Sequence, residues 1–186
     1  IYEERLHGKL ETDDMQNMAM AYAVSKEKKR EAITEMITEL CVSGVNAIVK
    51  SEERLQQIRS LFDLDGITVF SDRGNRLVCR NGNYMAEAPD GRLGFEDEGY
   101  LSLFGDDDIF VESNMIKLRS QNPAAYAVTQ EQEVGAALQC LSRKEGIPYT
   151  MVSFEVFNRN RKWSDKDVTL LTLLGHCIGD LLNYSE

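Results

Sequence analysis

The chain is poor in the residues that build metal sites and disulfide frameworks. It contains two histidines, His7 and His176, and four cysteines, at positions 41, 79, 140 and 177. The cysteines are far apart, none has CxxC spacing, and no histidine lies at metal-ligand spacing from them. The sequence therefore predicts no metal site, and we expect reduced thiols in a cytoplasmic protein.

Long apolar runs and an excess of positive charge are also missing. No apolar stretch approaches the roughly 18 residues of a membrane-spanning helix, and no secretory signal is visible. Lysine and arginine number 21 against 31 aspartates and glutamates, a net charge of −10. This balance argues against nucleic acid or an anionic membrane as partner.

Sequence motifs of common enzymes are absent as well. The chain contains no GxGxxG or GxxxxGK[ST] run for phosphate binding, no HExxH and no GxSxG. We therefore expect no catalytic residue in this chain, and an enzyme acting on a small molecule is the least favoured hypothesis.

The size and composition are those of one globular domain. The 186 residues are 42% apolar and 28% charged. A chain of this length and composition can bury a core without disulfides or structural metals to stabilise it. The chain begins at Ile1 and ends just after an apolar helical pattern, so we expect a piece of a longer protein. We predict an N-terminal segment over 1–30, a linker or signalling helix, followed by a domain over 31–186.

Helical periodicity is strongest over residues 31–62. Apolar residues recur there at spacings of three, four and seven, which predicts a helix. An unbroken helix of this length is unusual, so we expect a break at Gly44 or at Ser51. Ser51 is favoured, because Glu52 and Glu53 behind it suit a new first turn.

Two hairpins and a long final helix follow. Residues 67–70 and 76–79 predict one antiparallel pair, and 135–142 and 147–157 predict another. From Ser164, a good N-cap, a helix follows that is apolar on more than one side. The order predicts an α+β fold: an antiparallel sheet with both terminal helices on one face.

The C-terminal third, residues 137–182, resembles the end of a GAF domain. The run from Asn160 to Trp163 and Ser164 is similar to the end of GAF-like sensor domains that precede GGDEF (diguanylate cyclase) domains in bacteria. Ser153 stands where that group usually has glycine. The resemblance implies a GAF-like sheet, with an irregular helix and loop segment over the face that the terminal helices leave free.

The resemblance also implies a ligand pocket beneath that irregular segment. The candidate pocket residues are Phe70, Cys79, Tyr84, Tyr100, Phe110, Met115, Tyr126, Cys140 and Ser153. The alternative is that they form a satellite core with no ligand. No cofactor is predicted: the Cys-His pair of bilin-binding relatives is absent, and the middle of the chain has no histidine for haem. An unknown small molecule is the remaining candidate.

Two hypotheses follow for the function. The first is a non-catalytic sensor, whose terminal helices relay ligand or partner binding to an output domain in the same polypeptide, a GGDEF diguanylate cyclase by resemblance. The second is a ligand-free dimerisation module. We expect a homodimer in either case, and the candidate interface residues are Leu170, Leu173, Cys177 and Leu181.

The strand-to-helix corner allows two structural expectations. Trp163 should be at least half buried, as an anchor where the last strand leads into the last helix. Arg159 or Arg161 should pair with Asp167 and hold this corner together.

Overall fold

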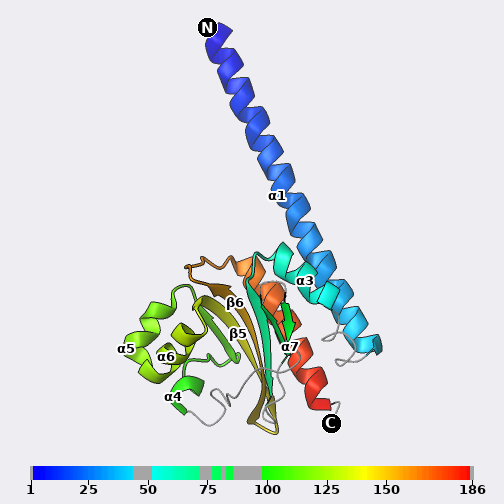
Figure 1. The fold of residues 1–186 in the computed structure, drawn as a ribbon. Coiled ribbons are helices and arrows are strands. Elements are labelled where there is room, and N and C mark those ends of the chain that lie inside the picture. Colours follow the sequence, from blue (N-terminus) through cyan, green and yellow to red (C-terminus); the bar gives the residue numbers. More distant parts are fainter. Residues whose placement is uncertain (1, 44–51, 72–76, 81–82, 86–97, 185–186) are drawn as a thin grey trace.

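The computed structural model describes residues 2–43, 52–71, 77–80, 83–85 and 98–184 (Figure 1). The elements before the last hairpin are α1 (Tyr2–Ser43), α3 (Glu52–Leu61), β1 (Gly66–Ser71), β2 (Leu77–Arg80), β3 (Asn83–Met85), α4 (Glu98–Leu101) and β4 (Ile109–Glu112). A 3-10 turn, η1 (Met115–Lys117), then leads into α5 (Leu118–Gln121), α6 (Pro123–Glu131), β5 (Val134–Lys144), β6 (Ile147–Phe157) and α7 (Asp165–Tyr184).

The strands form one six-stranded sheet with the order β3-β2-β1-β6-β5-β4. Every neighbouring pair is antiparallel, and β5 and β6 form the long central hairpin. The turn of that hairpin is Glu145-Gly146, with φ values of 54° and 83°. Glycine adopts such a left-handed conformation without strain. Both expected hairpins are therefore confirmed.

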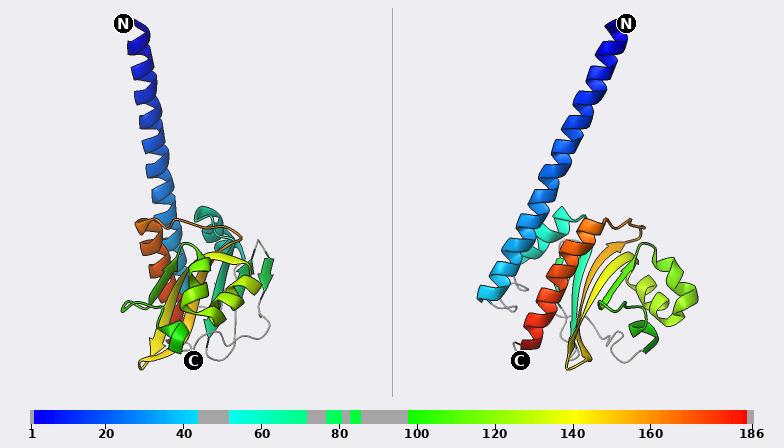
Figure 2. Two further views of the ribbon diagram at one scale, coloured as in Figure 1. Left: turned by 90° about the vertical axis from the view of Figure 1, so that its left-hand side faces the viewer. Right: turned by 180° about the vertical axis from the view of Figure 1, so that it is seen from behind.

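The sheet separates two apolar cores. The larger core lies between the sheet and the helices α1, α3 and α7, and the smaller one lies beneath α4, α5 and α6 (Figures 1 and 2). Strand alternation divides the central strands between them: Leu138 and Phe154 belong to the larger core, Leu141 and Met151 to the smaller. This arrangement confirms the predicted α+β fold with the terminal helices on one face.

Helix α1 is longer than the periodicity predicted. It runs without interruption through residue 30, where we placed a domain boundary, so that division stays a prediction. Its lower part is buried through Ala32, Ile33, Met36 and Leu40, whereas every side chain over 14–28 is exposed. The helix thus projects beyond the rest of the structure (Figure 2). Among the described helices, none has the length and apolar character needed to cross a membrane.

The apolar stripe of residues 31–62 is divided between two helices. Helix α1 ends at Ser43 and α3 begins at Glu52. The expected break points, Gly44 and Ser51, lie outside the described residues. Leu40 at the end of α1 and Leu55 in α3 both enter the larger core, which is why the pattern looks continuous in the sequence.

Helix α7 is buried on two sides, as its pattern predicts. Ser164 caps it: the Ser164 hydroxyl accepts a hydrogen bond of 3.1 Å from the amide of Asp167. One side of α7 packs on β5 and β6, and another packs on α1. Leu170 is accordingly buried within the chain itself, while Leu173 is 56% exposed. The side of α7 that carries Leu170 therefore meets another helix of the same chain, while Leu173 stays exposed.

Candidate functional site

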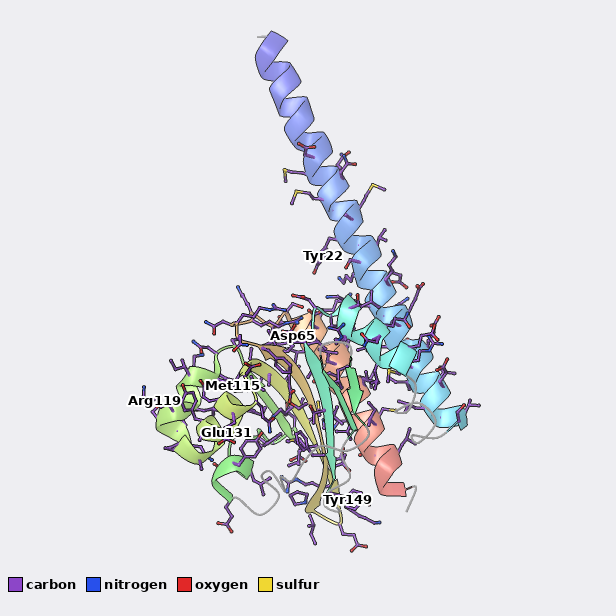
Figure 3. The ribbon with its side chains drawn as sticks, viewed as in Figure 1. Tyr22, Asp65, Met115, Arg119, Glu131 and Tyr149 are labelled. Atoms are coloured by element: carbon purple, nitrogen blue, oxygen red, sulfur yellow. The ribbon has the colours of Figure 1, made fainter. Side chains whose placement is uncertain are left out.

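Most of the predicted pocket residues come together beneath α4–α6. Tyr100 and Phe104 lie edge to face with ring centroids 5.9 Å apart, and Phe104 is 5.9 Å from Phe110. Figure 3 shows Met115 where η1 meets this side of the sheet. The smaller core contains the predicted residues Phe70, Tyr100, Phe110 and Met115, with Tyr126 partly buried against it.

A row of polar side chains crosses the same face of the sheet. Thr68 on β1 is the register partner of Ser153 on β6, and Ser153 is the partner of Gln139 on β5. All three are buried. Gln139 Nε2 donates a 3.2 Å hydrogen bond to Ser153 Oγ, and the Tyr100 hydroxyl donates to Gln139 Oε1. The row therefore runs from α4 to the centre of the sheet.

Glu155 places a carboxylate next to this row. Its side chain is 3% exposed, and Thr68 Oγ1 donates a 3.3 Å hydrogen bond to Glu155 Oε2. Burial raises the pKa of the Tyr100 hydroxyl well above its ordinary value, and the negative charge of Glu155 raises it further. Tyr100 therefore stays protonated. It is a neutral donor, while Glu155 is the acceptor of the hydrogen bond from Thr68.

Cys140 does not join this group. Strand alternation points Cys140 to the opposite face of β5, into the larger core against α7. A Cβ atom added at Gly175 of α7 would lie 2.7 Å from Cys140 Sγ, so helix and strand are in close contact there. Burial raises the pKa of the Cys140 thiol to about 12. Cys140 is thus a core residue and not part of the pocket face.

Two further candidates are placed only through their backbones. Cys79 on β2 pairs in register with Tyr84 on β3, at the edge of the sheet. Their side chains lie outside the described residues. Sequence reasoning missed three polar members of the row: Thr68, Gln139 and Glu155. Their signal was available, because a polar residue within an apolar strand pattern marks a face that differs from the rest of the core.

The strand-to-helix corner forms a second organised region. Asp167 Oδ1 lies 2.8 Å from Lys29 Nζ of α1, and its Oδ2 lies 3.1 Å from Arg161 Nη2. Arg161, not Arg159, is therefore the partner of Asp167. Its guanidinium stacks 4.3 Å from the Trp163 ring centroid, and Trp163 Nε1 donates to the Glu112 carbonyl at 3.2 Å. Trp163 is 8% exposed, which confirms that it is an anchor.

The same corner holds the entry into β1. Arg161 Nη1 donates to the carbonyls of Phe62 and Asp63, and Lys29 Nζ lies 4.9 Å from the Phe62 ring centroid. Asp65, directly before β1 (Figure 3), accepts a 2.8 Å hydrogen bond from the amide of Phe157. Helix α1, the α3–β1 connection and the start of α7 are therefore linked by a few charged contacts.

Metal binding finds no support in the described part of the chain. Within it, no group of three or more His, Cys, Asp or Glu side chains is placed to hold an ion. The site is better described as a buried polar row, Thr68, Ser153 and Gln139, with an aromatic cover.

Comparison with known proteins identifies the fold. No family model matches the sequence, and no curated protein matches it either. The chromophore-binding domain of a Stigmatella aurantiaca bacteriophytochrome aligns with TM-score 0.61 and 14% identity, over 83% of this chain and 60% of that one. A phycoerythrobilin-bound GAF domain from a cyanobacterial phytochrome aligns with TM-score 0.64 and 7% identity, over 85% and 96%.

A third similar structure is a far-red absorbing dark state with bound biliverdin IXa. It aligns with TM-score 0.57 and 17% identity, over 83% of this chain and 98% of that chain. The present chain thus spans about 60% of the bacteriophytochrome fragment and nearly all of the other two. At these identities the likeness establishes a GAF-like fold, the class that the sheet, its order and its two helical layers define.

Proposed function

We propose that this chain is a non-catalytic sensory or regulatory module of the GAF type. A small molecule or a partner domain contacts the sheet face beneath α4–α6. Its binding then biases how α1 and α7 pack on the opposite face. Such a ligand shifts the helices only if it binds one helix arrangement more tightly than the other.

One observation carries the proposal: adjacent residues of β5 and β6 contact the helical layers on opposite faces of the sheet. On β5, Gln139 belongs to the polar row and the next residue, Cys140, touches α7 at Gly175. On β6, Ser153 accepts from Gln139, and a Cβ added at Gly175 would lie 3.3 Å from Phe154. A rearrangement of the polar row therefore moves strand positions that contact α7 directly.

The named structural neighbours support a small-molecule ligand. Two of them hold bilins, biliverdin and phycoerythrobilin. This chain has no Cys-His dipeptide, so we do not propose a bilin attached at such a cysteine. We propose a non-covalent organic ligand held by Tyr100, Gln139, Ser153 and Glu155.

Native mass spectrometry of the purified chain tests this proposal. A discrete extra mass, lost or weakened in Tyr100→Phe and retained in Tyr22→Phe, would support the pocket. Tyr22 is the matched control because it is exposed on α1, far from the sheet face (Figure 3). Extra mass that persists in Tyr100→Phe and in Ser153→Ala would place the ligand elsewhere and contradict the assignment.

We propose a GGDEF diguanylate cyclase as the output domain in the same cytoplasmic polypeptide. The similarity of residues 152–164 to sensor domains of that group supports this, and the free thiols support the location. The coding sequence downstream of Glu186 tests it: a GGDEF run there supports the proposal, and another output domain contradicts it.

A ligand-free dimerisation module is the second candidate, and the exposed upper part of α1 favours it. Met15, Met18 and Tyr22 continue the helical line of the buried residues Ile33 and Met36, yet each is more than 60% exposed. Light scattering at increasing concentration tests the dimer. A monomer throughout would contradict it; a dimer lost in Met18→Glu but kept in Leu173→Glu would place the interface on α1 rather than on α7.

A further inference from the structure

Two free thiols lie on different terminal helices. Cys41 is in the last turn of α1 and is exposed, whereas Cys177 is in the second half of α7 and is partly buried. Neither belongs to the polar row or to the charged corner described above. Whether Cys41 and Cys177 lie close together depends on how α1 packs against α7.

The register of α1 against α7 sets the relative height of the two cysteines. Helices α1 and α7 run side by side in the same direction (Figures 1 and 2). The Lys29–Asp167 ion pair fixes their relative height near the start of α7. Cys41 lies twelve residues beyond Lys29, and Cys177 lies ten residues beyond Asp167. At about 1.5 Å per residue the two cysteines differ in height by only about 3 Å.

The electrostatics of Cys177 agree with this placement. Burial raises the pKa of the Cys177 thiol most, and the next group that raises it is the neighbouring Cys41. Cys177 is partly buried and packs against the larger core, as do Ile37 of α1 and Leu181 of α7. A disulfide needs two cysteines whose side chains already face each other across a short gap. The register places Cys41 and Cys177 at nearly the same height on neighbouring helices, and Cys41 is exposed to solvent.

We propose that Cys41 and Cys177 are a redox-sensitive pair, whose disulfide ties the end of α1 to α7. A hydroperoxide is the oxidant class. The Cys41 thiolate attacks the peroxide oxygen and forms a sulfenic acid, while the O–O bond breaks and water leaves after protonation. The Cys177 sulfur then attacks the Cys41 sulfur, the S–O bond breaks and a second water leaves. Two thiols and one hydrogen peroxide thus give one disulfide and two waters.

The roles of the two thiols follow from their surroundings. Cys41 is exposed and is the sulfur that the oxidant reaches. Desolvation raises the pKa of the Cys177 thiol, as do the neighbouring Cys41 and Asp180, which makes it the slower, resolving partner. The disulfide would hold α1 and α7 in one arrangement, and the rearrangement proposed for sensing requires that they move.

The test uses the full chain, first reduced and then treated with hydrogen peroxide. We expect a monomer lighter by two hydrogens (about 2 Da), restored by dithiothreitol, and a linked Cys41–Cys177 peptide after digestion. Cys41→Ser and Cys177→Ser should each abolish the mass loss. Cys79→Ser and Cys140→Ala should keep it, which makes them matched controls.

Peptide mapping of the unsubstituted chain keeps the test valid if a variant folds poorly. A linked peptide that joins other cysteines would overturn the proposal. So would a disulfide between two chains through Cys41, or stable sulfinic acid at Cys41 with Cys177 still reduced.

Discussion

Lys29 Nζ and Asp167 Oδ1 lie 2.8 Å apart, and this contact joins the N-terminal helix to the first turn of the last one. Arg161 binds the other oxygen of the same carboxylate and the carbonyl of Asp63. One carboxylate therefore organises two cations from distant parts of the chain. Burial lowers the pKa of the Arg161 guanidinium, and Asp167 opposes that shift by stabilising its charge.

Asp167→Ala should lower the free energy of unfolding by about 3 kcal/mol, because it leaves two partly buried cations without their shared partner. Urea denaturation measures the loss. Asp165→Ala is the matched control: Asp165 lies in the same first turn but is exposed. It should cost less than about 1 kcal/mol, the range of a helix-end charge effect. Equal losses in the two variants would contradict the role given to Asp167.

Trp163 is the only tryptophan of the chain, so its fluorescence reports on this corner alone. Its burial against Arg161 should place the emission maximum well below the wavelength of indole in water, with a red shift on unfolding in urea. Trp163→Phe removes the bond to the Glu112 carbonyl and the stacking on Arg161. We expect a loss of about 1–3 kcal/mol. Emission at the wavelength of free indole in the folded chain would refute the anchor.

The sequence predicted the features that depend on residues close together in the chain, and it missed those that depend on distant ones. The hairpins, the Ser164 cap and the Trp163 anchor follow from local pattern, and all are present. The continuity of α1 was missed, because residues 1–11 carry no apolar stripe in the sequence, so no periodic pattern predicted a helix there. The face of the sheet on which Cys140 lies depends on the strand register, and that register is set by turn geometry together with packing.

The candidate site was predictable only in part for the same reason. Aromatic residues such as Tyr100 and Phe110 stand out in an irregular segment. Gln139 and Glu155 become meaningful only once β5 and β6 are paired and their shared face is known. Likewise, a helix that is apolar on more than one side can be covered by another helix of its own chain or by a second chain. In the structure α1 covers the side of α7 that carries Leu170, whereas Leu173 is exposed.

Tyr100→Phe tests the buried polar row without removing the ring. The substitution leaves the Gln139 carbonyl oxygen without this donor in a buried environment, which should cost about 1–3 kcal/mol in the free energy of unfolding. Tyr22→Phe, at an exposed position on α1, should change stability by less than about 0.5 kcal/mol. Urea denaturation compares them. A Tyr100→Phe chain as stable as the Tyr22→Phe chain would show that the hydrogen bond contributes nothing to folding.

Cys140 predicts how stability depends on pH. In the unfolded chain a cysteine loses its proton at about pH 8.5, whereas burial raises the pKa of folded Cys140 to about 12. The buried, neutral Cys140 thiol therefore contributes its full share to the free energy of unfolding below about pH 8.5. Above that pH its contribution declines by about 1.4 kcal/mol per pH unit. Under reducing conditions, the difference in unfolding free energy between the native chain and Cys140→Ala should shrink by about 2 kcal/mol from pH 8.5 to 10.5. A gap that stays constant would contradict the buried, neutral thiol.

Gly175→Ala tests the contact through which the sheet meets α7. The new Cβ would lie 2.7 Å from Cys140 Sγ and 2.9 Å from Cys140 Cβ. Helix and strand must therefore move apart, at a cost of about 1–3 kcal/mol in the free energy of unfolding. Cys140→Ala removes the closer atom, so the double variant should be more stable than the sum of the two single losses predicts. Leu173→Ala, on the exposed side of the same helix, should change stability by less than about 1 kcal/mol. Strict additivity of Gly175→Ala and Cys140→Ala would mean that α7 and β5 are not coupled at this point, and the proposed route from the polar row to the terminal helices would then lose its mechanical link.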